Sequence, residues 1–377
     1  MSRNLLLGTV SAIGVATTAA ADVPSVAVDI APVHSLVSMV MGDLGTPDLL
    51  VQPGASPHGY SMRPSEAAAL DAANVVFWIG EGLEPWLEGP LEALASDAHV
   101  IELIEAEGTN ELEIREGATF EKHSHDDDHH DEEHSEEEDH DDHDGHGDED
   151  HAEAHKEHDD HDHDEHAHED DHDEHAHEDD HDEHAHEDDH DEHAHEDDHD
   201  DHHHEGHDPH AWLDPENARA WLDVIAAELS ELDPENAETY SANAAAGREQ
   251  IAGVIDDVTA TLEPVRGKEF VVFHDAYQYF ENRFDFSAAG SIRLGDSSDP
   301  SPARIQEIHD KVKELDITCA FSEPQFNANM IDTVFQGTDA TVGVLDPLGA
   351  DLELGATLYP ELIRNMGSNL ADCLKGS

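Results

Sequence analysis

The sequence predicts an α/β protein of two lobes, each a parallel sheet flanked by helices, joined by one long rigid helix. Three observations support this fold class. Short β-branched runs alternate with amphipathic runs in the first third of the chain, and the same alternation returns in its last third. A long stretch with apolar residues at helical spacing lies between the two regions. A histidine- and acid-rich tract interrupts the first lobe.

Four runs in the first region predict strands, and three segments between them have helical spacing with Pro or Ser near their starts. The strand runs are SVAVDIA (25–31), DLLVQPG (48–54), VVFWIG (75–80) and HVIELIE (99–105). The helical segments are HSLVSMVMGDL (34–44), RPSEAAALDAA (63–73) and PWLEGPLEALASD (85–97). Strands that alternate with helices predict a parallel sheet covered by helices.

The second region repeats this alternation. Its predicted strands are EFVVFH (269–274), FSAAGSIR (286–293), ITCAFSEP (317–324) and ATVGVLDP (340–347). Its predicted helices are DAYQYFENR (275–283), SPARIQEIHDKVKEL (301–315), NANMIDTVFQG (327–337) and PELIRNMGSNLADCL (360–374). The chain therefore contains two similar α/β units.

A helix over residues 233–264 is expected to join the two units. Asp233 is a favourable N-cap, Pro234 suits the first helical position, and Pro264 ends the segment. The apolar residues on one face are Ile251, Val254, Ile255, Val258 and Leu262. Such a helix spans roughly 45 Å at about 1.5 Å per residue. It predicts a stiff strut, because a flexible linker would be rich in Gly or Ser.

The N-terminus has the features of a secretory signal peptide. Arg3 supplies positive charge, LLLGTVSAIGVA is an apolar core too short to span a bilayer, and AAA at 19–21 is a small-residue cleavage site. The predicted parts are a signal peptide (1–21), an N-terminal lobe (22–232), a linking helix (233–264) and a C-terminal lobe (265–377). No later apolar run is long enough to cross a membrane, so we expect a soluble periplasmic monomer.

The formal charge of −77 is concentrated in an insert at residues 121–207. Thirty of the 35 histidines lie between His123 and His210. The insert has few large apolar side chains and repeats DEHAHEDDH from Asp164, Asp173, Asp182 and Asp191, so it is expected to be disordered. So strong an acidic balance argues against nucleic acid as a partner, because phosphate would be repelled. It suits a cation instead.

The two cysteines, Cys319 and Cys373, are the only ones in the chain. In an oxidising compartment they favour one disulfide, which would tie the C-terminus to its lobe. The alternative is a pair of zinc ligands, which is weaker because no C-x-x-C motif is present.

Three histidines stand in motifs that should fold. His58 follows DLLVQPG, His274 ends EFVVFH, and His210 lies where the sequence becomes foldable again after the insert. Open α/β sheets bind ligands at the carboxyl ends of their strands, so a shared ligand would lie between the lobes. Three imidazoles and one oxygen make a tetrahedral zinc site, and Asp346 in VGVLDPLG is a candidate oxygen donor. Surface histidines and a turn aspartate are the simpler structural interpretation.

Four other residues are weaker candidates. His34 is expected to pack at a helix start rather than line the cleft, and His99 and His309 are expected at the surface. Glu323 in FSEPQF either supports a ligand or is a solvated strand end, and the sequence favours neither.

Taken together, PGASPHGYSMRPS, HDPHAWLDP, VVFHDAYQYF, FSEPQF and LDPLG resemble, in this order, the motifs of zinc-specific solute-binding proteins of bacterial ABC transporters. These form the ZnuA type of the cluster A-I metal-binding family, and the resemblance spans the mature chain except the insert. It implies zinc in an inter-lobe cleft, held by His58, His210 and His274. Manganese-binding relatives carry a carboxylate where His274 stands, and imidazole suits zinc. The fourth ligand stays open between Asp346 and water, since Pro57 stands where some members have Glu.

The resemblance also implies a disulfide between the two cysteines and a non-enzymatic function. That function is capture of periplasmic Zn²⁺ and its delivery to the membrane permease of an ABC transporter, with the insert as a weaker zinc-binding antenna. Two alternatives remain: a periplasmic zinc buffer or storage protein, and a manganese- or iron-binding relative. A zinc hydrolase is disfavoured because the chain has no H-E-x-x-H motif.

Overall fold

The computed structural model describes residues 23–115, 206–293, 301–326, 334–335, 337–338 and 340–376. The predicted signal peptide (1–21), nearly all of the insert (121–207) and most of the predicted helix at 327–337 lie outside the described residues. The described residues all fall in one of the two units into which the chain divides.

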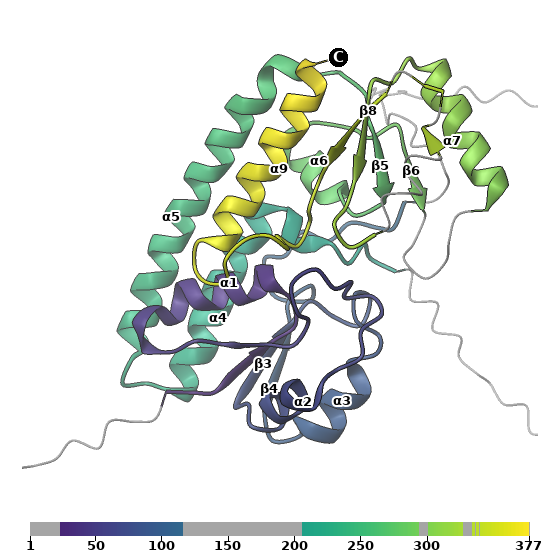
Figure 1. The fold of residues 1–377 in the computed structure, drawn as a ribbon. Coiled ribbons are helices and arrows are strands. Elements are labelled where there is room, and N and C mark those ends of the chain that lie inside the picture. Colours follow the sequence, from purple (N-terminus) through teal and green to yellow (C-terminus); the bar gives the residue numbers. More distant parts are fainter. Residues whose placement is uncertain are drawn as a thin grey trace, which may run out of the picture. The chain divides into compact units, whose positions relative to one another are not determined.

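The first sheet contains four parallel strands in the order β2-β1-β3-β4. Figure 1 labels β3 and β4 of this sheet. Val26 pairs with Val75 in the two central strands. Successive side chains point to opposite faces, so Val28 and Phe77 lie in the main core whereas Val76 lies in a separate cluster. The strands are β1 (Val26–Val28), β2 (Asp48–Leu49), β3 (Val75–Trp78) and β4 (His99–Glu102).

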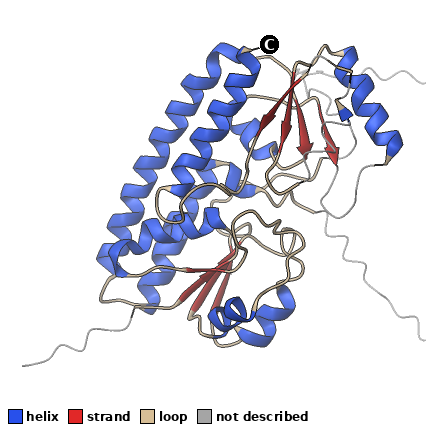
Figure 2. Cartoon of the chain, viewed as in Figure 1, coloured by secondary structure: helices blue, strands red, loops and turns tan. Residues whose placement is uncertain are grey.

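Helices cover both faces of this sheet, as buried parallel strands require (Figure 2). Helices α2 (Pro64–Asp71) and α3 (Glu88–Leu94) lie on one face, where Leu70 and Leu91 pack in the cluster that contains Val76. On the other face lies α1 (Ala31–Met41), which is followed by a short 3-10 turn, η1 (Gly42–Leu44).

The second sheet repeats the design with the parallel order β6-β5-β7-β8. Its strands are β5 (Val271–His274), β6 (Gly290–Arg293), β7 (Cys319–Ser322) and β8 (Thr341–Val344). Val271 and Phe273 pack with α7 (Pro302–Glu314) in a cluster of their own, while Val272 faces the main core with α9 (Leu358–Lys375). Helix α6 (Gln278–Phe284) follows β5. The predicted fold class is confirmed.

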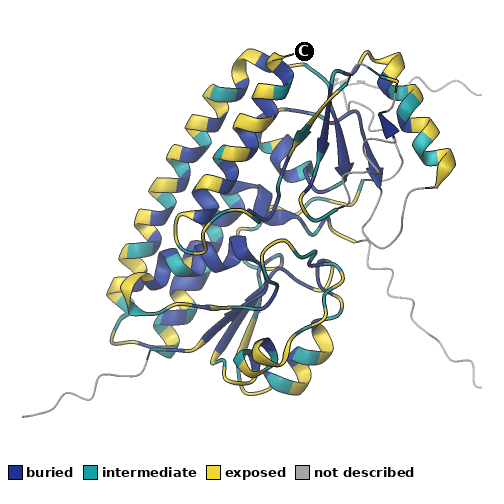
Figure 3. Cartoon of the chain, viewed as in Figure 1, coloured by how far each residue is buried: buried dark blue, intermediate teal, exposed yellow. Residues whose placement is uncertain are grey.

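The linking helix α5 (Ala237–Leu262) contacts α1 and α4 (Pro215–Leu232), which precede it in the chain, and α9, which follows it. It buries one face along its length (Figure 3). The helix begins later than predicted: Asp233 ends the preceding helix, and its carboxylate accepts hydrogen bonds from Tyr240 (2.9 Å) and Asn236 (2.7 Å). At its other end α5 runs into the 3-10 turn η3 (Glu263–Val265), which contains Pro264.

No element was predicted at residues 215–232, where the structure has α4 (Pro215–Leu232). The sequence nevertheless contains the signals for the start of this helix. Asp214 caps the helix by accepting a hydrogen bond from the Glu216 N–H at 2.9 Å, and Pro215 occupies the first position. Trp221 and Ile225, four residues apart, are fully buried. The 3-10 turn η2 (Ala211–Leu213) precedes it.

A disulfide joins Cys319 in β7 to Cys373 in α9, with 5.9 Å between their Cα atoms. The sequence favours this bridge over a pair of zinc ligands, and the bridge is confirmed. Among the described residues, no helix is both long and apolar enough to cross a membrane. The lobe boundaries at 232 and 265 stay predictions.

Candidate metal centre

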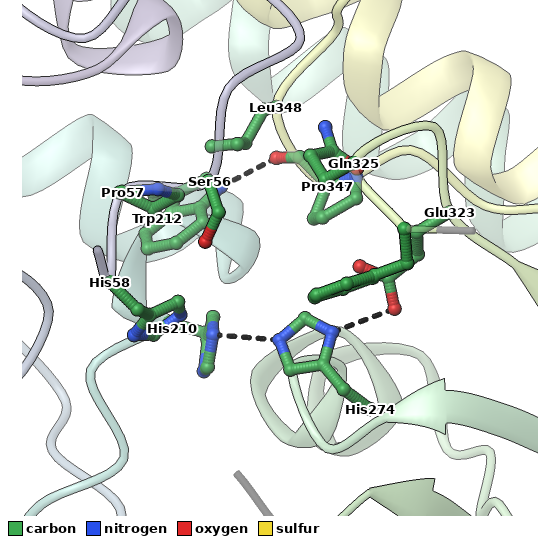
Figure 4. A pocket seen from close by; sticks show the side chains of 11 residues that line it. Ser56, Pro57, His58, His210, Trp212, His274, Glu323, Gln325, Pro347 and Leu348 are labelled. Atoms are coloured by element: carbon green, nitrogen blue, oxygen red, sulfur yellow. Dashed lines mark hydrogen bonds and ion pairs between the residues drawn. The ribbon is translucent and has the colours of Figure 1, made fainter. Parts of the chain in front are cut away.

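Three of the four predicted site residues meet at one point. Donor nitrogens of His58, His210 and His274 all lie within 4.8 Å of one another (Figure 4). The rings of His210 and His274 have centroids 5.1 Å apart, and both residues are 5% exposed. His58 is half-buried. These histidines are separated by 152 and 64 positions in sequence. His58 lies beyond the carboxyl end of β2 and His274 at the carboxyl end of β5, where open α/β sheets bind ligands, whereas His210 lies at the start of η2.

His58 lies in an irregular loop that follows β2. The indole N–H of Trp86 donates to the Pro57 carbonyl at 2.7 Å, directly before this histidine. The Tyr60 ring packs against Trp86 with 5.6 Å between centroids, and its hydroxyl donates to Glu66 at 3.0 Å. The loop is therefore braced by the start of α2 and the segment before α3.

His210 is held by Asp208, a residue that the sequence analysis did not single out. One carboxylate oxygen of Asp208 lies 2.7 Å from Nδ1 of His210 and 3.0 Å from its backbone N–H. Asp208 is 3% exposed. The available signal was an acid two residues before a histidine, with Pro209 between them.

His274 is held in the same way by Glu323, with 2.7 Å between Nδ1 and Oε1. β5 pairs directly with β7, so their carboxyl ends place these two side chains together. The Glu323 side chain is 1% exposed. The sequence leaves open whether Glu323 supports a ligand or is a solvated strand end. In the structure it holds a histidine and is buried.

These carboxylates decide which imidazole nitrogens carry hydrogen. A carboxylate accepts, so Nδ1 of both His210 and His274 must donate, and a neutral ring then presents a lone pair at Nε2. The two Nε2 atoms face each other at 3.2 Å. Two ligands at about 2.05 Å from a tetrahedral Zn²⁺ lie ~3.3 Å apart. The pair has the spacing and the electron pairs that a zinc ion needs.

The three histidines open onto a cavity of about 10 Å³. Its other walls are largely apolar and include Pro57, Trp212, Phe326, Pro347 and Leu348 (Figure 4). This is roughly the space of one water molecule.

Asp346 is not part of the group of converging donor atoms. Its carboxylate accepts from the backbone N–H groups of Leu348 (3.0 Å), Gly349 (3.0 Å) and Ala350 (2.6 Å), and from the Gln325 amide (3.1 Å). It thus closes the turn after β8. Its role as a fourth ligand stays a prediction.

Of the three remaining histidines outside the insert, His34 and His99 are placed as expected. His34 is buried in α1, with Nδ1 3.4 Å from the Ser38 hydroxyl, and burial lowers its pKa. His99 is exposed at the start of β4 and lies 2.9 Å from Glu228. His309 is half-buried on α7.

Comparison with known proteins agrees with this geometry. The family model for the zinc-uptake complex component A, periplasmic, matches residues 26–373. The high-affinity zinc uptake system protein ZnuA of Brucella abortus is 44% identical over 349 residues, which cover 93% of this chain and 91% of that protein. ZnuA of Paracoccus denitrificans is 39% identical over 376 residues, covering 99% of both.

A crystal structure of ZnuA superposes with a TM-score of 0.63 at 21% identity and covers 94% of this chain and all of that one. At this identity the superposition supports the fold. The matched family model and the two relatives cover nearly the whole chain, and this chain therefore belongs to the ZnuA family of periplasmic zinc-uptake components, which are solute-binding proteins and not enzymes.

Proposed function

We propose that this protein captures one Zn²⁺ ion between His58, His210 and His274 and delivers it to the membrane permease of an ABC transporter. Zinc is here the cargo rather than a resident cofactor. The observation that carries the proposal is the pair of Nε2 atoms at 3.2 Å, each backed by a carboxylate at 2.7 Å on its own Nδ1. Two neutral imidazoles held this way repel each other until a cation lies between them.

The size and polarity of the cavity support zinc over manganese. Zn²⁺ accepts three nitrogens and one further ligand in a tetrahedron, whereas Mn²⁺ favours more ligands and mainly oxygen donors. The cavity is small, about 10 Å³, and walls such as Trp212 and Phe326 offer no oxygen donors to a manganese ion. We therefore assign one water as the fourth ligand, because the Asp346 carboxylate is occupied by its turn.

Substitution of each ligand tests the site. His58→Ala, His210→Ala and His274→Ala should each weaken zinc binding more than the 10- to 100-fold that is typical of residues behind a ligand. His99→Ala is the matched control, because His99 is exposed and away from the cluster. Affinity is measured on the full chain against a competing chelator, so that only the tight site is counted. Undiminished affinity in the His274→Ala protein would refute the assignment.

Delivery to a permease is tested in cells. A strain that lacks this protein should fail to grow in chelated medium, and the wild-type chain should restore growth while His274→Ala should not. Unchanged zinc uptake in the deletion strain would favour the alternative of a periplasmic zinc buffer.

A further inference from the structure

Two short segments pair at the base of the insert. The Ile114 N–H donates to the Gly206 carbonyl at 3.1 Å, and the Asp208 N–H donates to the Leu112 carbonyl at 2.7 Å. An antiparallel bridge joins Glu113 and His207 between them. We call residues 112–115 and 206–208 the root ribbon. One of its strands leads directly into His210 through Asp208.

Arg115, on the other strand of the root ribbon, reaches two acidic side chains near His274. Its guanidinium donates to both oxygens of Asp275, through Nε at 3.1 Å and through Nη2. It also donates to both oxygens of Glu281, from Nη1 at 2.8 Å and Nη2 at 3.2 Å. The side chains of Arg115, Asp275 and Glu281 are only 17%, 10% and 4% exposed.

The two acids connect this arginine to the element that carries a metal ligand. Asp275 directly follows His274, and Glu281 lies in α6. Glu281 also accepts from the Ala288 N–H at 3.0 Å, just before β6. A further bond runs from the Leu112 N–H to the Tyr279 hydroxyl at 3.0 Å. The root ribbon is therefore attached to the β5–α6 segment at two of its residues, Leu112 and Arg115.

We propose that Arg115 is a positioning residue for zinc. It clamps the root ribbon, whose Asp208 orients His210, onto the segment that begins with His274, and so sets the separation between two ligands. This inference rests on the proposed zinc site. A metal site needs its ligands held within a few tenths of an ångström, which the partners behind the ligands provide. Without Arg115, the nearly buried carboxylates of Asp275 and Glu281 lose this countercharge. They then repel each other, which displaces the segment that follows His274.

The planar guanidinium group makes the proposal specific to arginine. A guanidinium bonds two carboxylates at fixed angles, whereas a lysine supplies charge at a single point. Arg115→Ala should lower zinc affinity by about tenfold, the lower end of the range for supporting residues. Arg115→Lys should recover part of that loss. Arg364→Ala is the matched control, because Arg364 also donates twice to a carboxylate, that of Asp257, but on the exposed faces of α9 and α5.

The measurements use the full chain and three readouts. Zinc affinity is measured against a chelator, the visible spectrum of bound Co²⁺ at a limiting amount of metal reports ligand geometry, and thermal unfolding of the metal-free protein reports stability. The expected result is a lower affinity and an altered Co²⁺ spectrum in Arg115→Ala, with both unchanged in Arg364→Ala.

A lower unfolding temperature in Arg115→Ala with wild-type affinity and spectrum would overturn the proposal, because Arg115 would then only stabilise the fold. If Arg115→Ala does not fold, Arg115→Lys decides, and wild-type affinity and spectrum in that protein overturn it equally. The proposed function is tested by different outcomes. It fails if the wild-type chain binds no zinc tightly, or if His274→Ala binds zinc as tightly as the wild-type chain.

Discussion

Two carboxyl groups buried in the first lobe should make the stability of this protein depend on pH. Asp29, which follows β1, and Glu84, in the segment after β3, are both 0% exposed. Asp29 accepts from the Ile30 and Ile79 N–H groups at 2.6 Å each, yet burial raises its pKa from 3.8 to about 7. Burial, and then the neighbouring charge of Asp29, raise the pKa of Glu84 well above its usual value.

The direction of the effect follows from proton binding. The folded protein holds the Asp29 proton more tightly than the unfolded chain, so the free energy of unfolding falls as pH rises from 3.8 through about 7 and levels off above it. With these two values, Asp29 alone lowers the free energy of unfolding by roughly 2.5 kcal/mol between pH 5 and pH 8. Glu84 extends the decline to higher pH.

The perturbation is Asp29→Asn, which removes the titration and keeps the size of the side chain. Asn offers one acceptor oxygen instead of two, so the substitution carries a pH-independent cost of about 1 kcal/mol or more in the free energy of unfolding. That constant cancels when each protein is compared with itself at pH 5 and pH 8. Contributions of distant carboxylates and of the histidines cancel between the two proteins in the same way. The contribution of Glu84 does not cancel fully, because the charge of Asp29 raises its pKa, and this coupling adds to the loss in the wild-type chain.

The assay is reversible urea unfolding of the metal-free protein at the two pH values. The wild-type chain should lose roughly 2.5 kcal/mol more than Asp29→Asn on going from pH 5 to pH 8. Equal losses in the two proteins, within about 0.5 kcal/mol, would show that Asp29 is ionised throughout this range in the folded state. The reasoning from burial would then be wrong.

Three further predictions concern zinc. Deletion of residues 121–205, which keeps Gly206 in the root ribbon, should remove several weak sites and leave one tight site in calorimetry, and loss of the tight site from a folded variant would contradict the division between cleft and insert. As pH falls from about 7.5 to 6, the insert should release zinc before the cleft, because dense carboxylates favour the imidazolium form; zinc titrations at several pH values and two salt concentrations check this order. Asp346→Asn should change zinc affinity less than about threefold if water completes the tetrahedron, and a much larger loss would identify the carboxylate as the ligand.

Local sequence signals predicted most of the secondary structure. Each of the eight strands in the described part of the chain lies within one of the predicted strand runs. Helix α4 was missed although Asp214 and Pro215 mark its start, and α5 begins later than predicted because Asp233 bonds to Tyr240 and ends α4 instead of capping α5. A good N-cap residue between two helices can end the first helix or begin the second, and its contacts in the folded protein determine which.

The site was predictable only in part, for a related reason. His58, His210 and His274 follow from strand ends and motifs that can be read along the chain. The partnership of Glu323 with His274 depends on β5 and β7 being neighbours, which the sequence does not state. Asp346 lies at the predicted strand end, but three backbone N–H groups of its own turn compete for its oxygens.

The charges around the site match a divalent cargo. In the proposed site the three imidazoles are neutral ligands, so a bound Zn²⁺ would bring two positive charges into a largely buried place, and a buried charge without compensation costs several kcal/mol. Asp208 and Glu323 supply one negative charge each, transmitted through the imidazoles that they orient. In the proposed site, the charges of Asp208 and Glu323 would balance those of Zn²⁺, whereas a monovalent ion would leave one of them unbalanced. The same two carboxylates that aim the lone pairs therefore also select the charge of the ion that the lone pairs bind.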